Sequence, residues 1–225
     1  RGLGDVYKRQ EEMRMLVDVA KAHDLFIIGD EAYREFVYAG EPLQSMGQFE
    51  DAAENVIVID TVSKRFSACG ARIGCMISRN KELMAQAMKY AQCRLSVPTL
   101  DQVAAAALYT VGPDYFAAVR EEYKRRRDTV VNKLHEIPGV VCECPRGAFY
   151  IMAALPVDDA DAFQKWLLEE FEDNGDTVMF APGEPFYGTP GKGKNEIRIA
   201  YVLKQADLER AMDLLAKGIA AYNAR

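Results

Sequence analysis

The sequence has few of the residues on which metal centres and disulfide scaffolds are built. Its 225 residues include only two histidines, and its five cysteines are odd in number and form no C-x-x-C pair. This composition argues against a histidine-rich metal site, a zinc ribbon and a disulfide framework. Cysteines that stand singly in apolar contexts are typical of a reducing compartment, so we expect a cytoplasmic location.

The chain also lacks a long apolar run and an excess of positive charge. No stretch of 18 apolar residues and no signal peptide is visible, so we expect no membrane partner. Lysine and arginine total 28 against 34 acidic residues, and the net charge of −6 argues against nucleic-acid binding, which usually needs a basic face. A hydrophobic fraction of 49% in a chain of this length suits one large or two small globular domains.

The first half of the chain alternates short apolar runs with amphipathic segments. Continuous apolar runs at residues 25–29, 55–60 and 73–77 fit strands that are buried on both faces, as in a parallel sheet. Apolar residues at helical spacing and end signals predict the neighbouring helices. These helices are expected at residues 11–23, 80–94, 99–110 and 113–136.

The second half has a different pattern, with shorter strands and more turns. Strands are expected at residues 140–144, 148–153, 178–180 and 196–202, and helices at residues 158–172 and 205–222. We therefore predict an α/β domain part over residues 11–112, then a connecting helix and a smaller α+β domain over residues 113–225. Residues 1–10 have no periodicity and no initiating methionine, and we interpret them as a non-native segment.

The first chemical constellation is the sequence GDEAY at residues 29–33. Asp30 ends a predicted strand, and open parallel sheets bind ligands at that edge. Its carboxylate could hold a cation or a protonated ring nitrogen, and Tyr33 could donate a hydrogen bond to the same ligand. The alternative is an aspartate that only caps a turn.

The second constellation follows the next strand. Thr61, Ser63 and Arg72 offer two hydroxyls and a guanidinium that could bind a phosphate, with the arginine as a bidentate fork. Lys64 could be a nucleophilic amine of the kind that forms Schiff bases with carbonyls. The alternative is a solvated basic loop. The glycines on either side of Arg72 favour a site, because they allow close approach of the backbone.

The third constellation is a single charge in an apolar strand. Alternation over residues 196–202 places Ile197, Ile199 and Tyr201 on one face and Arg198 on the other, among small apolar neighbours. An arginine buried without a partner is costly, so we expect it to meet a carboxylate. That carboxylate could belong to a ligand or to the protein itself.

Four motifs follow one another along the chain: DEAY at residues 30–33, SK at 63–64, GARIG at 70–74 and IRI at 197–199. In this order and at these spacings they resemble the class I and II pyridoxal-phosphate (PLP) aminotransferases, and most closely the bacterial aspartate-aminotransferase-like enzymes. The sequence RGAFY at residues 146–150 also resembles a strand of the family's small domain. Each motif alone is weak evidence, whereas four in order at these spacings are strong.

The resemblance implies a fold and the roles of three residues. It implies part of the mostly parallel sheet of the family's large domain, followed by a C-terminal α+β small domain. Lys64 would form the Schiff base with PLP and move the substrate proton. Asp30 would pair with the pyridinium nitrogen, which keeps the ring an electron sink. Tyr33 would donate a hydrogen bond to the phenolic oxygen of the ring.

The resemblance also assigns the two anionic groups of cofactor and substrate. Arg72, Ser63 and Thr61 would hold the phosphate of PLP. Arg198 would bind the substrate α-carboxylate, a bidentate task for which lysine is poorly suited. The substrates would be an amino acid and a 2-oxo acid, with an aspartate-type substrate expected on resemblance alone. A full-length enzyme would be a homodimer.

One departure from the family pattern concerns the N-terminus. The family carries an N-P-T-G segment just before the first helix predicted here, whereas this chain has Gly2-Leu3-Gly4-Asp5. We therefore interpret the chain as the C-terminal portion of an aminotransferase. Two alternatives use the same cofactor residues. One is another PLP enzyme of this fold, such as a lyase or decarboxylase, and the other is the PLP-binding domain of a transcriptional regulator.

Overall fold

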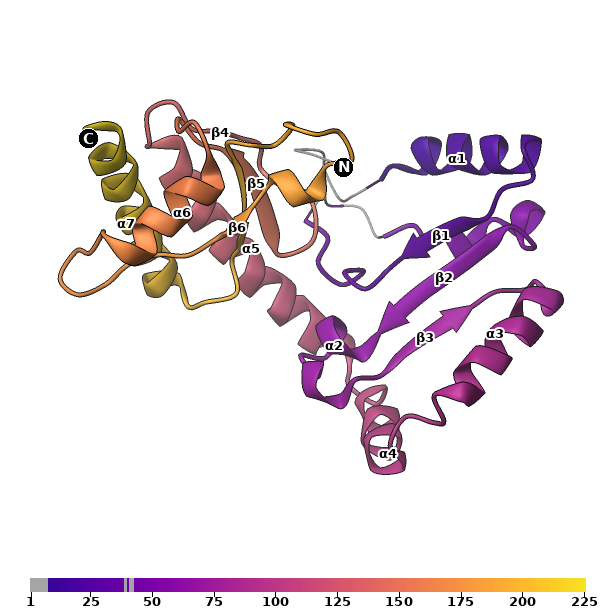
Figure 1. The fold of residues 1–225 in the computed structure, drawn as a ribbon. Coiled ribbons are helices and arrows are strands. Elements are labelled where there is room, and N and C mark those ends of the chain that lie inside the picture. The colour runs from indigo at the N-terminus through magenta and orange to yellow at the C-terminus, as the bar shows by residue number, and fades with distance from the viewer. Residues whose placement is uncertain (1–7, 39, 41–42) are drawn as a thin grey trace. The chain divides into compact units, whose positions relative to one another are not determined.

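The computed structural model describes residues 8–38, 40 and 43–225, so most of the segment predicted to be non-native, residues 1–7, lies outside the described part (Figure 1). The described chain divides into two compact units, residues 8–117 and residues 118–225. The boundary falls inside helix α5 (Pro113–His135).

The first unit is built on a three-stranded sheet with the order β1-β2-β3. Strands β1 (Ile27–Asp30) and β2 (Val56–Thr61) are parallel, whereas β3 (Gly74–Ile77) is antiparallel to β2. The expectation that the third apolar run belongs to a parallel arrangement is therefore wrong. Parallel neighbours need a substantial crossover, usually a long helix, and the link from β2 to β3 contains only short helical turns.

Burial also differs among these three strands. The residues of β2 are mostly buried, as the apolar run predicts, but Ile28 of β1 is 67% exposed and Ile77 of β3 is 54% exposed. The expectation of strands buried on both faces thus holds only for the central strand. One side of the sheet packs against helix α1, where Met13 and Val17 form a small core with residues of β2.

Three helices of the first unit, α1, α3 and α4, lie close to the predicted positions, whereas α2 was not predicted. Helix α1 begins where the side chain of Glu12 accepts a hydrogen bond from the backbone N–H of Arg9, at 2.7 Å. The side chain of Asn80 caps α3 by accepting from the N–H of Leu83, at 2.9 Å. The α-helices are α1 (Gln10–Ala22), α2 (Val62–Arg65), α3 (Lys81–Cys93) and α4 (Thr99–Leu108), and the 3-10 turns are η1 (Met46–Gln48), η2 (Glu50–Ala52) and η3 (Cys69–Ala71).

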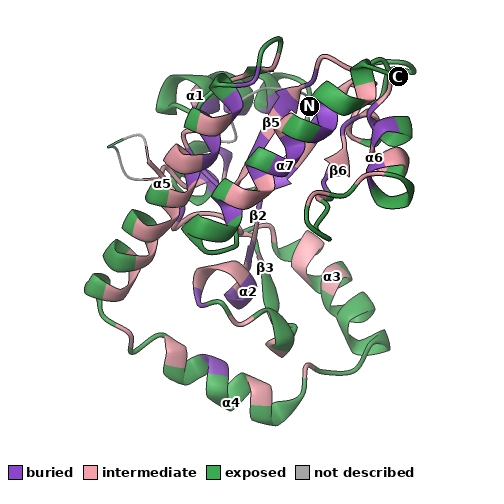
Figure 2. Ribbon diagram, turned by 90° about the vertical axis from the view of Figure 1, so that its left-hand side faces the viewer, coloured by how far each residue is buried: buried purple, intermediate pink, exposed green. Residues whose placement is uncertain are grey.

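The second unit contains an antiparallel sheet with the order β4-β5-β7-β6. Its central pair, β5 and β7, joins Tyr150 to Ala200 through Ala154 to Glu196. Helices α5, α6 and α7 enclose a single large core that includes Leu134, Phe163 and Tyr201 (buried residues are purple in Figure 2). The elements are β4 (Val141–Cys142), β5 (Tyr150–Ala154), α6 (Ala160–Glu169), β6 (Ala181–Pro182), η4 (Glu184–Phe186), β7 (Glu196–Ala200) and α7 (Gln205–Asn223).

The strand predicted at residues 178–180 is wrong in position. The backbone of this segment bonds to helix α6 instead of to the sheet, because the side chain of Gln164 accepts the N–H of Phe180 at 3.0 Å. Pairing with β7 begins only at Ala181, opposite Arg198. Among the described helices, none combines the length and the apolar character that crossing a membrane requires.

Candidate active site

The parallel pair β1 and β2 brings two of the predicted site segments to one edge of the sheet. Asp30 is the last residue of β1 and Thr61 is the last residue of β2, and Asp30 lies opposite Ile59 in the register. The carboxyl ends of parallel strands point to the same edge, which is where open α/β sheets bind ligands. The topology therefore places the two constellations side by side.

Two of the predicted phosphate-binding hydroxyls are in contact. Thr61 precedes the short helix α2, and its Oγ1 accepts the backbone N–H of Ser63 at 3.1 Å and lies 3.0 Å from the Ser63 Oγ. The same hydroxyl donates to the carbonyl oxygen of Ile73, at 2.7 Å. This bond ties the segment that carries Arg72 to the end of β2.

Lys64 and Arg72 both follow this pair of hydroxyls along the chain. Lys64 is half-buried on α2, one residue after the buried Ser63. Arg72 is exposed, has left-handed backbone angles (φ 54°, ψ 37°) and donates from Nη1 to the carbonyl oxygen of Cys69 at 3.2 Å. A left-handed arginine is uncommon, so the surrounding turn specifies how this side chain leaves the backbone.

Asp30 shows features of both predicted alternatives. Its side chain is at the open edge of the sheet, and its Oδ1 also accepts the N–H of Ala32 at 3.1 Å, which is the turn-capping role. Because a carboxylate has further acceptor positions, this bond leaves the group able to pair with a ligand. Tyr33 is half-buried and its ring meets that of Phe36 edge to face, with centroids 6.5 Å apart.

Arg198 lies in the second unit, on β7, and its surroundings bear on the two sources predicted for its carboxylate partner, a ligand or the protein itself. Ile197, Ile199 and Tyr201 are buried as the alternation predicts. Within the described part of this unit, however, no protein carboxylate forms an ion pair with Arg198. The guanidinium instead lies over the rings of Phe186 and Tyr150, with its central carbon 4.6 Å and 5.5 Å from their centroids.

The aromatic contacts explain how this arginine is accommodated without a carboxylate. A guanidinium is weakly hydrated and stacks favourably on aromatic faces, so two rings can hold it while its N–H groups stay available. A cavity of about 370 Å³ opens beside it, bordered mainly by apolar residues of α7 and of residues 177–181.

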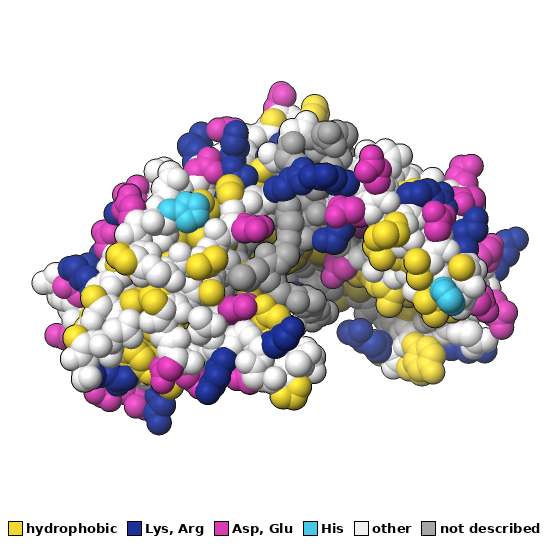
Figure 3. Space-filling view, turned by 90° about the horizontal axis from the view of Figure 1, so that it is seen from above, with side chains coloured by type: hydrophobic (Ala, Val, Ile, Leu, Met, Phe, Trp, Pro, Cys, Tyr) yellow, Lys and Arg dark blue, Asp and Glu magenta, His cyan; other side chains and the backbone are white. Residues whose placement is uncertain are grey.

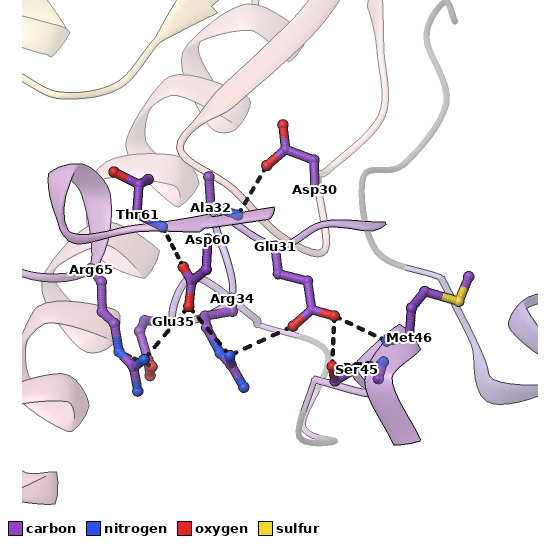
Figure 4. A network of polar contacts seen from close by, with 11 residues as sticks. Asp30, Glu31, Ala32, Arg34, Glu35, Ser45, Met46, Asp60, Thr61 and Arg65 are labelled. Carbon is purple, nitrogen blue, oxygen red and sulfur yellow. Dashed lines mark hydrogen bonds and ion pairs between the residues drawn. The ribbon is translucent and has the colours of Figure 1, made fainter. Parts of the chain in front are cut away.

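Four charged residues near the sheet edge were not identified from the sequence. Glu31 and Asp60 are each only 7% exposed, and Arg34 and Arg65 lie against them (Figure 4). The sequence did contain a signal, since charged residues follow directly on the two predicted strands. Residue type and order alone do not show that such charges turn inward.

Comparison with known proteins identifies the family of this chain. The family described as aminotransferase class I and II matches residues 3–215. Aspartate aminotransferase of Bacillus subtilis is 30% identical over 95% of this chain and 54% of its own length. Aromatic-amino-acid aminotransferase 2 of Thermococcus litoralis is 30% identical over 92% of this chain and 52% of its own length. The chain thus spans about half the length of the curated relatives it matches.

Solved structures show the same fold. The α-aminoadipate aminotransferase of Thermus thermophilus, which was crystallised with N-(5'-phosphopyridoxyl)-L-leucine, superposes with a TM-score of 0.84 at 24% identity. The match covers 96% of this chain and 55% of that one. At this identity the structural likeness establishes the fold alone, whereas the family match extends over nearly the whole sequence. The chain belongs to the class I and II aminotransferases.

Proposed function

We propose that this chain is the PLP-binding part of an aminotransferase that moves an amino group between an amino acid and a 2-oxo acid. The observation that carries the proposal is the shared edge of β1 and β2, where Asp30 and the Thr61–Lys64 segment end adjacent parallel strands. The proposal includes a cytoplasmic location, expected from the cysteine usage, and a homodimeric full-length enzyme, expected from the family resemblance.

The donor groups at this edge fit the three functional groups of PLP. Thr61, Ser63 and Arg72 supply hydroxyls and a guanidinium, which suit a phosphate. The carboxylate of Asp30 suits a protonated ring nitrogen, and the amine of Lys64 suits an aldehyde. When bound, PLP would supply an electron sink for bond cleavage at the substrate Cα.

The remaining residues would orient the reactants. Tyr33, three residues after Asp30, would donate a hydrogen bond from its hydroxyl to the phenolic oxygen of the ring. The Lys64 amine would accept the proton that leaves the substrate Cα and would return it at the C4′ carbon of the cofactor. Arg198, stacked on Phe186, would bind the α-carboxylate of the substrate through its free edge.

The matched relatives differ in the substrate that their names give. An aspartate-type substrate remains our expectation, from the resemblance and from the Bacillus subtilis relative. The aromatic-amino-acid aminotransferase of Thermococcus litoralis is equally similar, at 30% identity. Sequence identity therefore does not decide between an aspartate-type and an aromatic substrate. An aspartate-type substrate has a second carboxylate, which would need a second cation besides Arg198.

The other PLP chemistries remain alternative functions. A lyase or a decarboxylase of this fold would use the same Lys64 and Asp30. The names of the matched relatives favour transamination over both, and over the PLP-binding domain of a regulator, because these relatives are described as aminotransferases.

The first experiment is to incubate the purified chain with PLP, reduce it with borohydride and map the modified lysines by mass spectrometry. We expect selective labelling of Lys64, because this lysine follows directly on Thr61 and Ser63 at the edge that β2 shares with β1. Lys89, an exposed lysine on α3, is the internal control. Labelling of Lys64 no faster than that of Lys89 would contradict the proposal for this chain.

A further inference from the structure

A buried ionic network lies next to the residues proposed to bind the cofactor, and its members have no role in the proposed function. Figure 4 shows it at the carboxyl ends of β1 and β2, where it joins the loop after Asp30 to helix α2. Two carboxylates at its centre, Glu31 and Asp60, have side chains only 6% and 9% exposed. Charges this buried are costly unless they are paired, so their partners are fixed by the fold.

Asp60 connects β2 to the start of the lysine-bearing helix. Its Oδ1 accepts the backbone N–H of Thr61 at 2.7 Å, directly before α2. Its Oδ2 lies 3.4 Å from Arg34 Nη1 and 3.7 Å from Arg65 Nη1. One carboxylate therefore contacts the strand end, the loop after β1 and the residue that follows Lys64.

Arg34 lies between the two buried carboxylates. Its Nη1 is 3.6 Å from Glu31 Oε2 and 3.4 Å from Asp60 Oδ2. The other oxygen of Glu31 accepts the hydroxyl of Ser45 at 2.7 Å and the N–H of Met46 at 3.0 Å, which fixes it against turn η1. The Oε2 of Glu31 has no hydrogen bond, so Arg34 is the group that compensates its charge.

Arg65 limits the rotation of α2. Its Nε lies 3.0 Å from Glu35 Oε1 at an angle outside hydrogen-bonding geometry, so this contact is ionic. The guanidinium also lies 5.5–5.6 Å from the ring centroids of Phe66, Tyr109 and Phe116. Successive residues of a helix point about 100° apart, so a fixed Arg65 also fixes the direction in which Lys64 leaves the helix.

We infer that Asp60 and Arg34 are positioning residues that hold Lys64 in register with Asp30 and Tyr33. The inference rests on the proposed function, in which Lys64 reacts with the cofactor that Asp30 orients. Asp30 and Tyr33 lie on the segment at the end of β1, and Lys64 lies on the segment after β2. The parallel ladder fixes the relative position of the two strands, whereas the side-chain network fixes the position of the segments that follow them. A displacement of about 1 Å between reacting groups is enough to reduce a rate by up to about a hundredfold.

The test compares Asp60→Asn with Asp51→Asn as a matched control. Asp51 also pairs with two cations of the same unit, Arg14 and Lys21, each at 2.8 Å. Its side chain, however, is 47% exposed and lies on η2, before the start of β2. In the cofactor-free chain we expect amide hydrogen exchange over residues 62–66 to rise about tenfold in Asp60→Asn and to stay unchanged in Asp51→Asn.

PLP titration followed by borohydride reduction supplies the second readout. In Asp60→Asn we expect the plateau of Lys64 labelling to fall about tenfold while the PLP concentration at half-maximum changes by less than about twofold. This split distinguishes positioning from general loss of structure, because Thr61 and Arg72, which lie outside residues 62–66, would still bind the phosphate. Arg34→Lys keeps the charge and should give a smaller effect of the same kind, even where Asp60→Asn fails to fold.

The outcomes separate the two proposals. Unchanged exchange over residues 62–66 in Asp60→Asn overturns the inference, whatever the labelling shows. An unchanged plateau in Asp60→Asn, with selective Lys64 labelling in the wild type, also overturns it. If wild-type Lys64 is not labelled selectively, the proposed function fails, and the exchange experiment alone decides whether the network holds α2.

Discussion

The contact between Tyr187 and Glu196 in the second unit makes the stability of this protein sensitive to pH. The Tyr187 hydroxyl donates to the Glu196 carboxylate on β7, and burial, with this bond, raises the pKa of Tyr187 to about 12. A raised pKa means that the contact stabilises the fold fully below the unfolded value near 10 and is lost as the pH rises toward 12. We expect Tyr187→Phe to lower the urea midpoint, and the gap from wild type to close between about pH 10 and 12.

Tyr90→Phe is the control for this experiment, since Tyr90 is 78% exposed on α3. Its urea midpoints should follow those of the wild type across the same pH series. A gap between wild type and Tyr187→Phe that persists unchanged at about pH 12 would show that ionisation of this phenol does not weaken the fold.

The residues show where sequence reasoning reaches its limit. The sequence predicts that Thr61 and Ser63 lie together, because both follow directly on one strand, and their oxygens are 3.0 Å apart. The burial of Asp60 was not predicted, because it depends on Arg34, which is 26 residues distant. The aromatic neighbours of Arg198 were not predicted, and the carboxylate expected to pair with it is not one of the described carboxylates of its own unit. The alternation showed a charge among apolar residues, but aromatic rings from two other segments hold it.

Helix α6 depends on one capping side chain. Asp159 Oδ1 accepts the N–H of Ala162 at 3.0 Å, and this bond, together with the nearby Lys194, lowers the pKa of Asp159. A lowered pKa stabilises the fold above the unfolded value near 4, and this contribution is lost as the pH falls through the folded value. We expect Asp159→Ala to cost about 1 kcal/mol at neutral pH and less in acid, measured by denaturant unfolding.

Asp161→Ala is the matched control. Asp161 is in the first turn of the same helix, so this substitution removes the same charge but leaves the capping bond of Asp159 intact. Its cost should be only a few tenths of a kcal/mol, from the helix dipole. Equal costs for the two variants would assign the effect of Asp159 to charge and not to capping.

The accuracy of the predicted elements follows from their length and from the contacts that define them. Long periodic segments such as α5 and α7 were predicted closely, since their pattern extends over several turns. Helix α2 was missed because four residues are too few to show a period, and it forms where Thr61 caps its first turn. The β6 strand was displaced because Gln164, from another element, bonds the predicted segment away from the sheet.

At the scale of the molecule, the two units differ in how much apolar surface they bury. The second unit has one continuous core over α5, α6, α7 and the sheet, whereas the described part of the first unit has two small clusters. Apolar side chains remain at the surface of the unit that contains α1 (yellow in Figure 3). The exposed apolar residues of this unit include Met15, Phe26 and Ile28. Because burial of apolar surface is the main stabilising contribution, the first unit should be the less stable one.

The single tryptophan allows the two units to be followed separately. Trp166 lies on α6, packs against the core of the second unit and contacts Phe171 and Tyr222, so its fluorescence reports on that unit. Circular dichroism reports on the helices of both units. We expect the dichroism signal to begin falling at a lower denaturant concentration than the fluorescence, because two independent units with unequal cores unfold in sequence.

A variant in each unit tests the assignment of the two transitions. Val17→Ala removes a fully buried side chain of the first unit, and Leu167→Ala removes one of the second. Val17→Ala should shift only the early part of the dichroism curve, and Leu167→Ala, at about 2–5 kcal/mol, should shift the fluorescence curve. Coincident transitions that both variants shift together would show instead that the chain unfolds as one cooperative body, with its stability shared between the units.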